Sequence, residues 1–236
     1  MEIPKSWKEI KVDQFIELHN LEEESLGSLF LYQLESLAIL TDEDADEIDI
    51  TPNELIEILD SLKWVSNEPR GYSAKLGNLT FRPFTYLTLG EFIDLEHYFS
   101  DDYINNLPLI CAILYRHTKQ DEWGNVIYEP YKYLPQDRAH LFNEVSITDV
   151  YGIIQLYLKF REEFIERYSF IFNPDIEGED EMDEEDKQAE KVENKWSWEM
   201  LLYSLSGEDI TKVDPITDLP LVFVFNFLAM KYETKS

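Results

Sequence analysis

Three aspartates at alternating positions form the arrangement in this sequence that is most similar to a metal-binding motif. Asp42, Asp44 and Asp46 have the spacing of the first ligands of a calcium-binding loop. Such a loop also needs glycine at its sixth position and a bidentate glutamate at its twelfth, where this chain has Glu47 and Asn53. We therefore interpret the run as an acidic segment that precedes a helix, and we expect no metal or other cofactor.

The histidines and carboxylates give no pattern that is typical of a catalytic site. None of the four histidines has the HxxxH or HExxH spacing, and the sequence has no GxSxG, Walker or GxGxxG motif. Carboxylate pairs occur throughout, so a solvated acidic surface explains them better than general acid–base chemistry does. We expect a protein that is not an enzyme. The histidines are His19, His97, His117 and His140.

The charge of the chain limits the classes of partner. With 49 acidic and 20 basic residues, the formal net charge is −29. Such a surface repels nucleic-acid phosphates and anionic lipid headgroups, so we expect no direct nucleic-acid or membrane binding and favour basic partners. No stretch has the ~18 consecutive apolar residues that span a bilayer, and the N-terminus has no apolar secretory core. We expect a cytoplasmic protein.

The single cysteine gives a consistent picture. Cys111 lies in the apolar run 107–114, where a buried and inert thiol is expected instead of a nucleophile. With one cysteine no internal disulfide can form, which agrees with a reducing compartment.

Hydrophobic periodicity predicts a mainly α fold, a multi-helix bundle with a small β-hairpin and an acidic linker to a C-terminal helical pair. Capping boxes at Thr51 with Glu54 and at Thr88 with Glu91 mark the starts of two helices. Gly77-Asn78, set between short β-compatible runs, predicts a hairpin near residues 72–84. Residues 119–133 are expected to form an irregular segment that contains a further turn or hairpin. The helices are expected over 12–21, 25–40, 52–64, 88–99, 103–117, 135–143, 148–171, 196–205 and 218–232.

Composition also predicts three parts along the chain: a helical body over 1–172, an acidic flexible linker over 173–195, and a C-terminal helical segment over 196–236. The linker holds an acidic tract whose like charges oppose compaction. The tract includes Asp180, Glu181, Asp183, Glu184, Glu185 and Asp186.

The last predicted helix is apolar nearly all round, with Asn226 as the polar residue in its middle. Such a helix is either central to a core or inserted into a partner, since an exposed version would aggregate. The two tryptophans that open the segment have the same alternatives, core anchor or interface hot spot. The candidate partner-binding residues are Trp196, Trp198, Phe223, Phe225, Phe227 and Leu228.

Five segments together resemble a group of phage proteins. They are residues 3–10 (IPKSWKEI), 14–15 (QF), 87–94 (LTLGEFID), 112–116 (AILYR) and 207–210 (GEDI). The chain is similar over most of its length to proteins encoded among the structural genes of crAss-like and related tailed phages of gut bacteria, described as tail assembly chaperone-like. The shared segments are structural and not catalytic.

The resemblance implies a helical protein that takes part in building a virion, as a tail assembly chaperone or a minor virion component. Its partners would be other phage structural or assembly proteins with basic or apolar surfaces. It would act in the host cytoplasm during infection or remain in the virion. The alternative is an acidic decoy that mimics DNA and sequesters a host nucleic-acid-binding protein, which would need carboxylates spaced like phosphates along one elongated face.

The acidic linker is directly testable by limited proteolysis. Nine acidic side chains between Asp175 and Asp186 repel one another and cannot bury, so nothing offsets the entropy of ordering this segment. We expect a low dose of protease to cut within 173–195 first, as read by mass spectrometry of the fragments. Early cleavage elsewhere, with this segment intact, would contradict the prediction.

Overall fold

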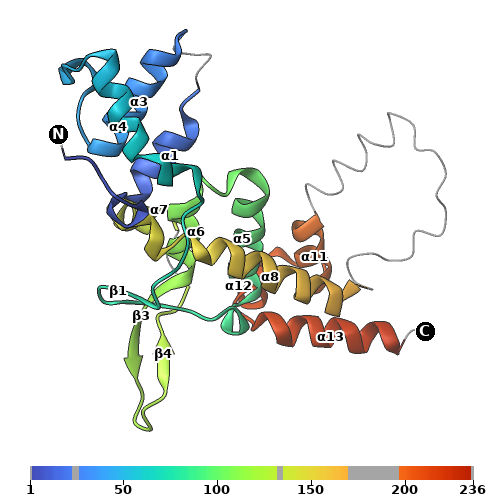
Figure 1. The fold of residues 1–236 in the computed structure, drawn as a ribbon. Coiled ribbons are helices and arrows are strands. Elements are labelled where there is room, and N and C mark those ends of the chain that lie inside the picture. Colours follow the sequence, from blue (N-terminus) through green and yellow to red (C-terminus); the bar gives the residue numbers. More distant parts are fainter. Residues whose placement is uncertain (1, 23–26, 132–134, 170–196, 235–236) are drawn as a thin grey trace, which may run out of the picture. The chain divides into compact units, whose positions relative to one another are not determined.

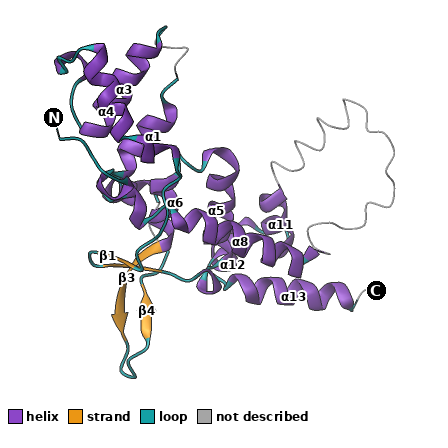
Figure 2. Cartoon of the chain, in the orientation of Figure 1, coloured by secondary structure: helices purple, strands orange, loops and turns teal. Residues whose placement is uncertain are grey.

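The structure, a computed structural model, describes residues 2–22, 27–131, 135–169 and 197–234 (Figure 1). Helices dominate these residues and one small antiparallel sheet accompanies them (Figure 2), which confirms the mainly α class. The chain forms two compact units. Unit 1 comprises Met1–Phe81 and Tyr98–Leu156, and unit 2 comprises Arg82–His97 and Tyr157–Ser236.

This division differs from the boundaries expected from composition. Residues 82–97 and 157–169 group with the C-terminal helices and not with the N-terminal body. The physical reason is aromatic packing between segments that are far apart in the sequence, described below for Phe92, Phe164 and Phe225. The predicted linker 173–195, with its acidic tract, lies outside the described residues.

Unit 1 contains most of the helices that periodicity predicts. α4 begins with the expected capping box, in which the backbone N–H of Thr51 donates to the Glu54 carboxylate (2.8 Å). The helices of this unit are α1 (Val12–Asn20), α3 (Leu29–Thr41), α4 (Pro52–Ser61), α6 (Leu107–Leu114), α7 (Gln136–Ala139), the end of α5 (Leu89–Asp102) and the start of α8 (Gly152–Arg167).

α6 forms the centre of the unit 1 core. Every residue of this helix except Leu109 is buried. Burial raises the pKa of the Cys111 thiol, because desolvation penalises the thiolate. The predicted burial of Cys111 is thus confirmed.

The sheet of unit 1 is larger than the predicted ribbon. β1 (Lys75–Leu76) and β2 (Leu79–Phe81) form the expected hairpin, with Gly77 at φ +58° in its turn. β3 (Tyr115–Gln120) and β4 (Val126–Tyr128) extend it to four antiparallel strands in the order β1-β2-β3-β4.

The helix expected over 103–117 is therefore wrong at both ends: residues 103–106 form a turn before α6, and the last three residues are not helical. α6 ends at Leu114, and Tyr115, Arg116 and His117 pair with β2. The Tyr115 hydroxyl also donates to the carbonyl oxygen of Ser73 (2.7 Å). These are contacts with segments 34 to 42 residues away in sequence, and a local periodicity cannot report them.

Two glycines allow the chain to pass close to itself in unit 1. The backbone N–H of Gly152 donates to the carbonyl oxygen of Gly71 (2.7 Å), and Gly71 has φ +103°. A Cβ added at Gly152 would lie 2.6 Å from that oxygen and 2.8 Å from the Gly71 carbonyl carbon. Both atoms belong to the backbone, so they cannot rotate away.

Unit 2 is built from the first part of α5, the second part of α8, and the helices α11 (Ser197–Ser206), α12 (Val213–Thr217) and α13 (Leu221–Glu233). The capping box at Thr88 is confirmed, since its backbone N–H donates to Glu91 (2.8 Å) and its hydroxyl accepts from the Glu91 N–H (3.3 Å). Among the described residues, no helix is long and apolar enough to cross a membrane.

The close approach of Gly71 and Gly152 predicts whether a substitution at Gly152 raises or lowers the stability of the protein. Alanine has the better helix propensity by up to about 1 kcal/mol, so Gly152→Ala would be neutral or stabilising if space were available. Because the added Cβ overlaps backbone atoms, we expect instead a loss of about 1–3 kcal/mol in the free energy of unfolding, measured by urea denaturation. Gln155→Ala, at an exposed position of the same helix, is the control and should change stability by less than about 0.5 kcal/mol. A Gly152→Ala protein as stable as the control would contradict this packing.

Candidate protein-binding site

The candidate site is α13, and its N-terminal end is fixed by backbone hydrogen bonds within unit 2. The N–H of Leu221 donates to the Leu87 carbonyl (2.9 Å), and the N–H of Leu89 donates to the Leu219 carbonyl (2.9 Å). Further along, the hydroxyl of Tyr168 donates to the side-chain oxygen of Asn226 (2.7 Å). The polar residue in the middle of this apolar helix therefore holds α13 to Tyr168, the residue that follows α8.

One face of α13 is buried against aromatic side chains of α8 and of Tyr168, which follows that helix. Leu221, Val224 and Phe225 are buried. The ring of Phe225 lies 4.8 Å from that of Phe164, nearly perpendicular to it, and 5.2 Å from that of Tyr168. Figure 1 shows α13 beside the second half of α8. Edge-to-face pairs at these distances stabilise by about 0.5–1.5 kcal/mol beyond the area that they bury.

The opposite face of α13 is apolar and exposed. Phe223, Phe227 and Met230 retain 59%, 49% and 54% of their accessible surface. Their spacing of four and then three residues places them on one side of the helix. We call these three residues the α13 ridge. Since the other face is held in the core, the ridge cannot be covered by rotating the helix.

The structure separates the candidate residues into different environments. Phe225 is a core residue, Phe223 and Phe227 are exposed, and Leu228 is half-buried. Trp198 is half-buried and packs edge-on against Phe92, with ring centroids 5.4 Å apart. Trp196 and the acidic tract lie outside the described residues, so their role in binding stays a prediction.

Buried charges in unit 2 are paired and hold its helices together. The Glu96 carboxylate accepts from the Tyr157 hydroxyl (2.7 Å) and from Nε of Arg161 (2.7 and 2.9 Å). Burial, followed by the neighbouring Glu96 charge, raises the pKa of Tyr157 well above its ordinary value, so this phenol stays protonated. The buried Glu91 carboxylate forms an ion pair with Arg82. Glu91 and Glu96 thus form hydrogen bonds and ion pairs that stabilise the fold of unit 2.

The run of aspartates has structural roles in unit 1. Asp42 ends α3 with φ +58° and forms an ion pair with Lys11 (3.2 Å), while Asp44 accepts the N–H of Asp46 (3.0 Å) to cap a short 3₁₀ turn. Within the described residues, no group of three or more His, Cys, Asp or Glu side chains is placed to hold a metal ion.

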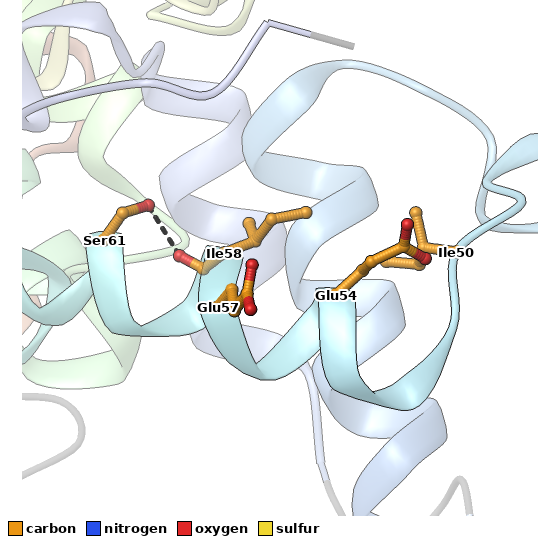
Figure 3. Close-up of a pocket in the computed structure, with 5 residues that line it drawn as sticks. All are labelled: Ile50, Glu54, Glu57, Ile58 and Ser61. Atoms are coloured by element: carbon orange, nitrogen blue, oxygen red, sulfur yellow. Dashed lines mark hydrogen bonds between the residues drawn. The ribbon is translucent and has the colours of Figure 1, made fainter.

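A shallow hollow beside α4 is shown in Figure 3, lined by Ile50, Glu54, Glu57, Ile58 and Ser61. Two of its polar side chains are engaged locally: Glu54 accepts the Thr51 N–H, and Ser61 donates to the Ile58 carbonyl (2.6 Å). The hydrogen bonds from Thr51 lower the pKa of Glu54. An ionised carboxylate that caps its own helix is a poor general base.

The sequence reasoning missed one ridge residue and the division between the two faces. Met230 was not among the candidate residues, although its spacing from Phe223 and Phe227 could have indicated a common face. Apolar residues at nearly every position mask such a stripe, because the pattern alone cannot say which side is covered.

The two faces of α13 predict opposite effects of the same substitution. Phe225→Ala removes a buried ring and is expected to lower the free energy of unfolding by about 3–5 kcal/mol. Phe227→Ala is the matched control on the exposed face and should cost less than about 1 kcal/mol. Chemical denaturation of both variants measures this difference. Equal losses would show that the ridge belongs to the core.

Comparisons of this chain with known proteins found no relative. No family model matches the chain, and neither a curated protein nor a solved structure is similar to it. The arrangement of α13 and the charge of the chain therefore carry the functional argument.

Proposed function

We propose that this protein works without catalysis, by holding another protein against the α13 ridge during the assembly of a virion. The observation that carries the proposal is the exposure of Phe223, Phe227 and Met230 on a helix whose other face is fixed in the core. A rigid row of large apolar side chains in water is typical of a protein-binding surface.

The resemblance to phage structural-module proteins supplies the biological setting of the proposal. In that setting the protein is tail assembly chaperone-like or a minor virion component, and its partners are other structural or assembly proteins. The net charge of −29 favours partners with basic residues around their apolar contact surface, because opposite charges accelerate encounter and like-charged competitors are repelled.

The acidic DNA mimic remains the second candidate, favoured by the same net charge. The two functions differ in what they need from the ridge. A mimic binds through carboxylates, so DNA would compete for its partner and moderate salt would weaken binding steeply. A ridge-dependent complex would survive the addition of DNA and would depend on Phe227.

Substitution of the ridge tests the proposal. Phe227→Asp places a charge where a partner must exclude water, whereas the half-exposed side chain leaves the fold intact. We expect the tagged wild-type protein to retain a defined structural protein from infected-cell lysate and the variant to lose it, with unchanged thermal melting. Mass spectrometry of the lysate identifies the retained partner. Mass spectrometry of purified virions shows whether the complex persists in the particle.

The control is Ile56→Asp, an exposed apolar position on α4 of unit 1, which should bind like the wild type. A Phe227→Asp protein that is folded, binds the same partner and supports assembly would overturn the proposed role of the ridge. Loss of binding on adding DNA, with no effect of Phe227→Asp, would favour the mimic.

A further inference from the structure

The outer part of the β3–β4 hairpin of unit 1 is a two-stranded ribbon. β2 pairs only with residues 115–117 of β3, whereas β4 pairs with residues 118–120. Figure 2 shows β3 and β4 extending together away from β1. Most side chains of this outer part are exposed, including Val126 and Ile127. Two-stranded ribbons are marginally stable in water unless something packs against them.

The turn at the end of the hairpin holds a tryptophan out in solvent. The Asp121 carboxylate accepts the backbone N–H groups of Trp123 (2.9 Å) and Asn125 (2.8 Å), and also the side-chain amide of Asn125 (2.8 Å). These bonds, the one from the Asn125 side chain first, lower the pKa of Asp121 and keep it ionised. The Trp123 side chain is 82% exposed on this ordered turn. An ordered, exposed tryptophan is a typical anchor of a protein interface.

A hollow that is lined by basic side chains, and is thus opposite in charge to Asp121 and Glu122 of the hairpin tip, lies elsewhere in unit 1. It is open to solvent and has a volume of about 410 Å³. The buried ring of Trp7 lines it, and Lys8 and Arg70 bring two positive charges against the single negative charge of Glu68. Within the described part of the chain, neither Lys8 nor Arg70 has a carboxylate partner.

The hollow is also preformed. The indole N–H of Trp7 donates to the carbonyl of Asn67, and its ring lies 5.2 Å from Trp64, edge to face. The hydroxyl of Ser146 donates to the Lys8 carbonyl (2.8 Å). The Trp7 ring and the Lys8 backbone are thus fixed before anything binds.

We propose that the hairpin tip of one copy docks into the Trp7 hollow of a second copy, with Trp123 in the hollow and Glu122 and Asp121 facing Lys8 and Arg70. The occupant is a second copy because the acidic tip and the basic hollow are complementary in charge. Tip and hollow are different surfaces, so the contact is head-to-tail, and repetition gives a ring or an open chain of copies. The contact is small and the copies repel one another, so assembly requires high protein concentration.

Sedimentation velocity of the full chain at about 0.15 M salt, where charges beyond about 8 Å are screened, tests this contact. We expect the mean sedimentation coefficient of the wild type to rise with concentration. Trp123→Ala, Arg70→Glu and Glu122→Arg should each remain monomeric at the same concentrations, since all three side chains are exposed and none supports the fold. Combining Arg70→Glu with Glu122→Arg restores opposite charges and should restore assembly.

Mixing two defective variants separates a head-to-tail contact from a symmetric one. Trp123→Ala keeps an intact hollow and Arg70→Glu keeps an intact tip, so their equimolar mixture should form a dimer and nothing larger. Phe227→Asp should assemble like the wild type, which distinguishes this contact from the α13 ridge. A wild type that stays monomeric up to several hundred micromolar, or a Trp123→Ala protein that still assembles, would overturn the proposal.

Discussion

The burial of one aromatic face of α13 is the constraint on which the candidate binding surface depends. Phe225 packs against Phe164 and Tyr168, and the hydrogen bond from Tyr168 to Asn226 fixes the rotation of the helix. With the rotation fixed, Phe223 and Phe227 must face solvent. The ridge therefore follows from the core of unit 2, and a change in that core would turn or release it.

The strongly acidic composition is compatible with this core because its buried carboxylates are neutralised in place. Glu96 accepts from Tyr157 and Arg161, and Glu91 is paired with Arg82. Removing one partner of such a pair leaves a buried charge without compensation, which typically costs about 3–5 kcal/mol. The excess negative charge is left to the surface, where it is solvated.

Unit 1 shows how a close backbone approach can place a surface feature. Gly152 and Gly71 bring the start of α8 against the segment that precedes β1, and Arg70 is next to this contact. The same segment carries Asn67, which accepts the indole N–H of Trp7. The positive hollow is thus a consequence of chain packing. The apolar ridge and the charged hollow use different physical forces, so they can select different partners.

Local signals in the sequence were sufficient for the elements that local interactions specify. The capping boxes at Thr51 and Thr88 and the turn at Gly77 are satisfied within a few residues of chain, so their residue types alone predicted helix starts and a hairpin. The burial of Cys111 followed in the same way from a segment that is apolar on every side.

Pairing between distant segments was decided only by the tertiary structure. Tyr115 to His117 leave the helical pattern because β2 offers them backbone partners. Which face of α13 is buried was likewise undetermined, since nearly every position is apolar and only Phe164 and Tyr168 select Phe225 over Phe227. The sequence by itself determined the helical class, the caps and the acidic surface, because these depend on neighbouring residues and on composition. The fold decided which apolar and basic side chains remain exposed, because exposure depends on contacts that no local pattern encodes.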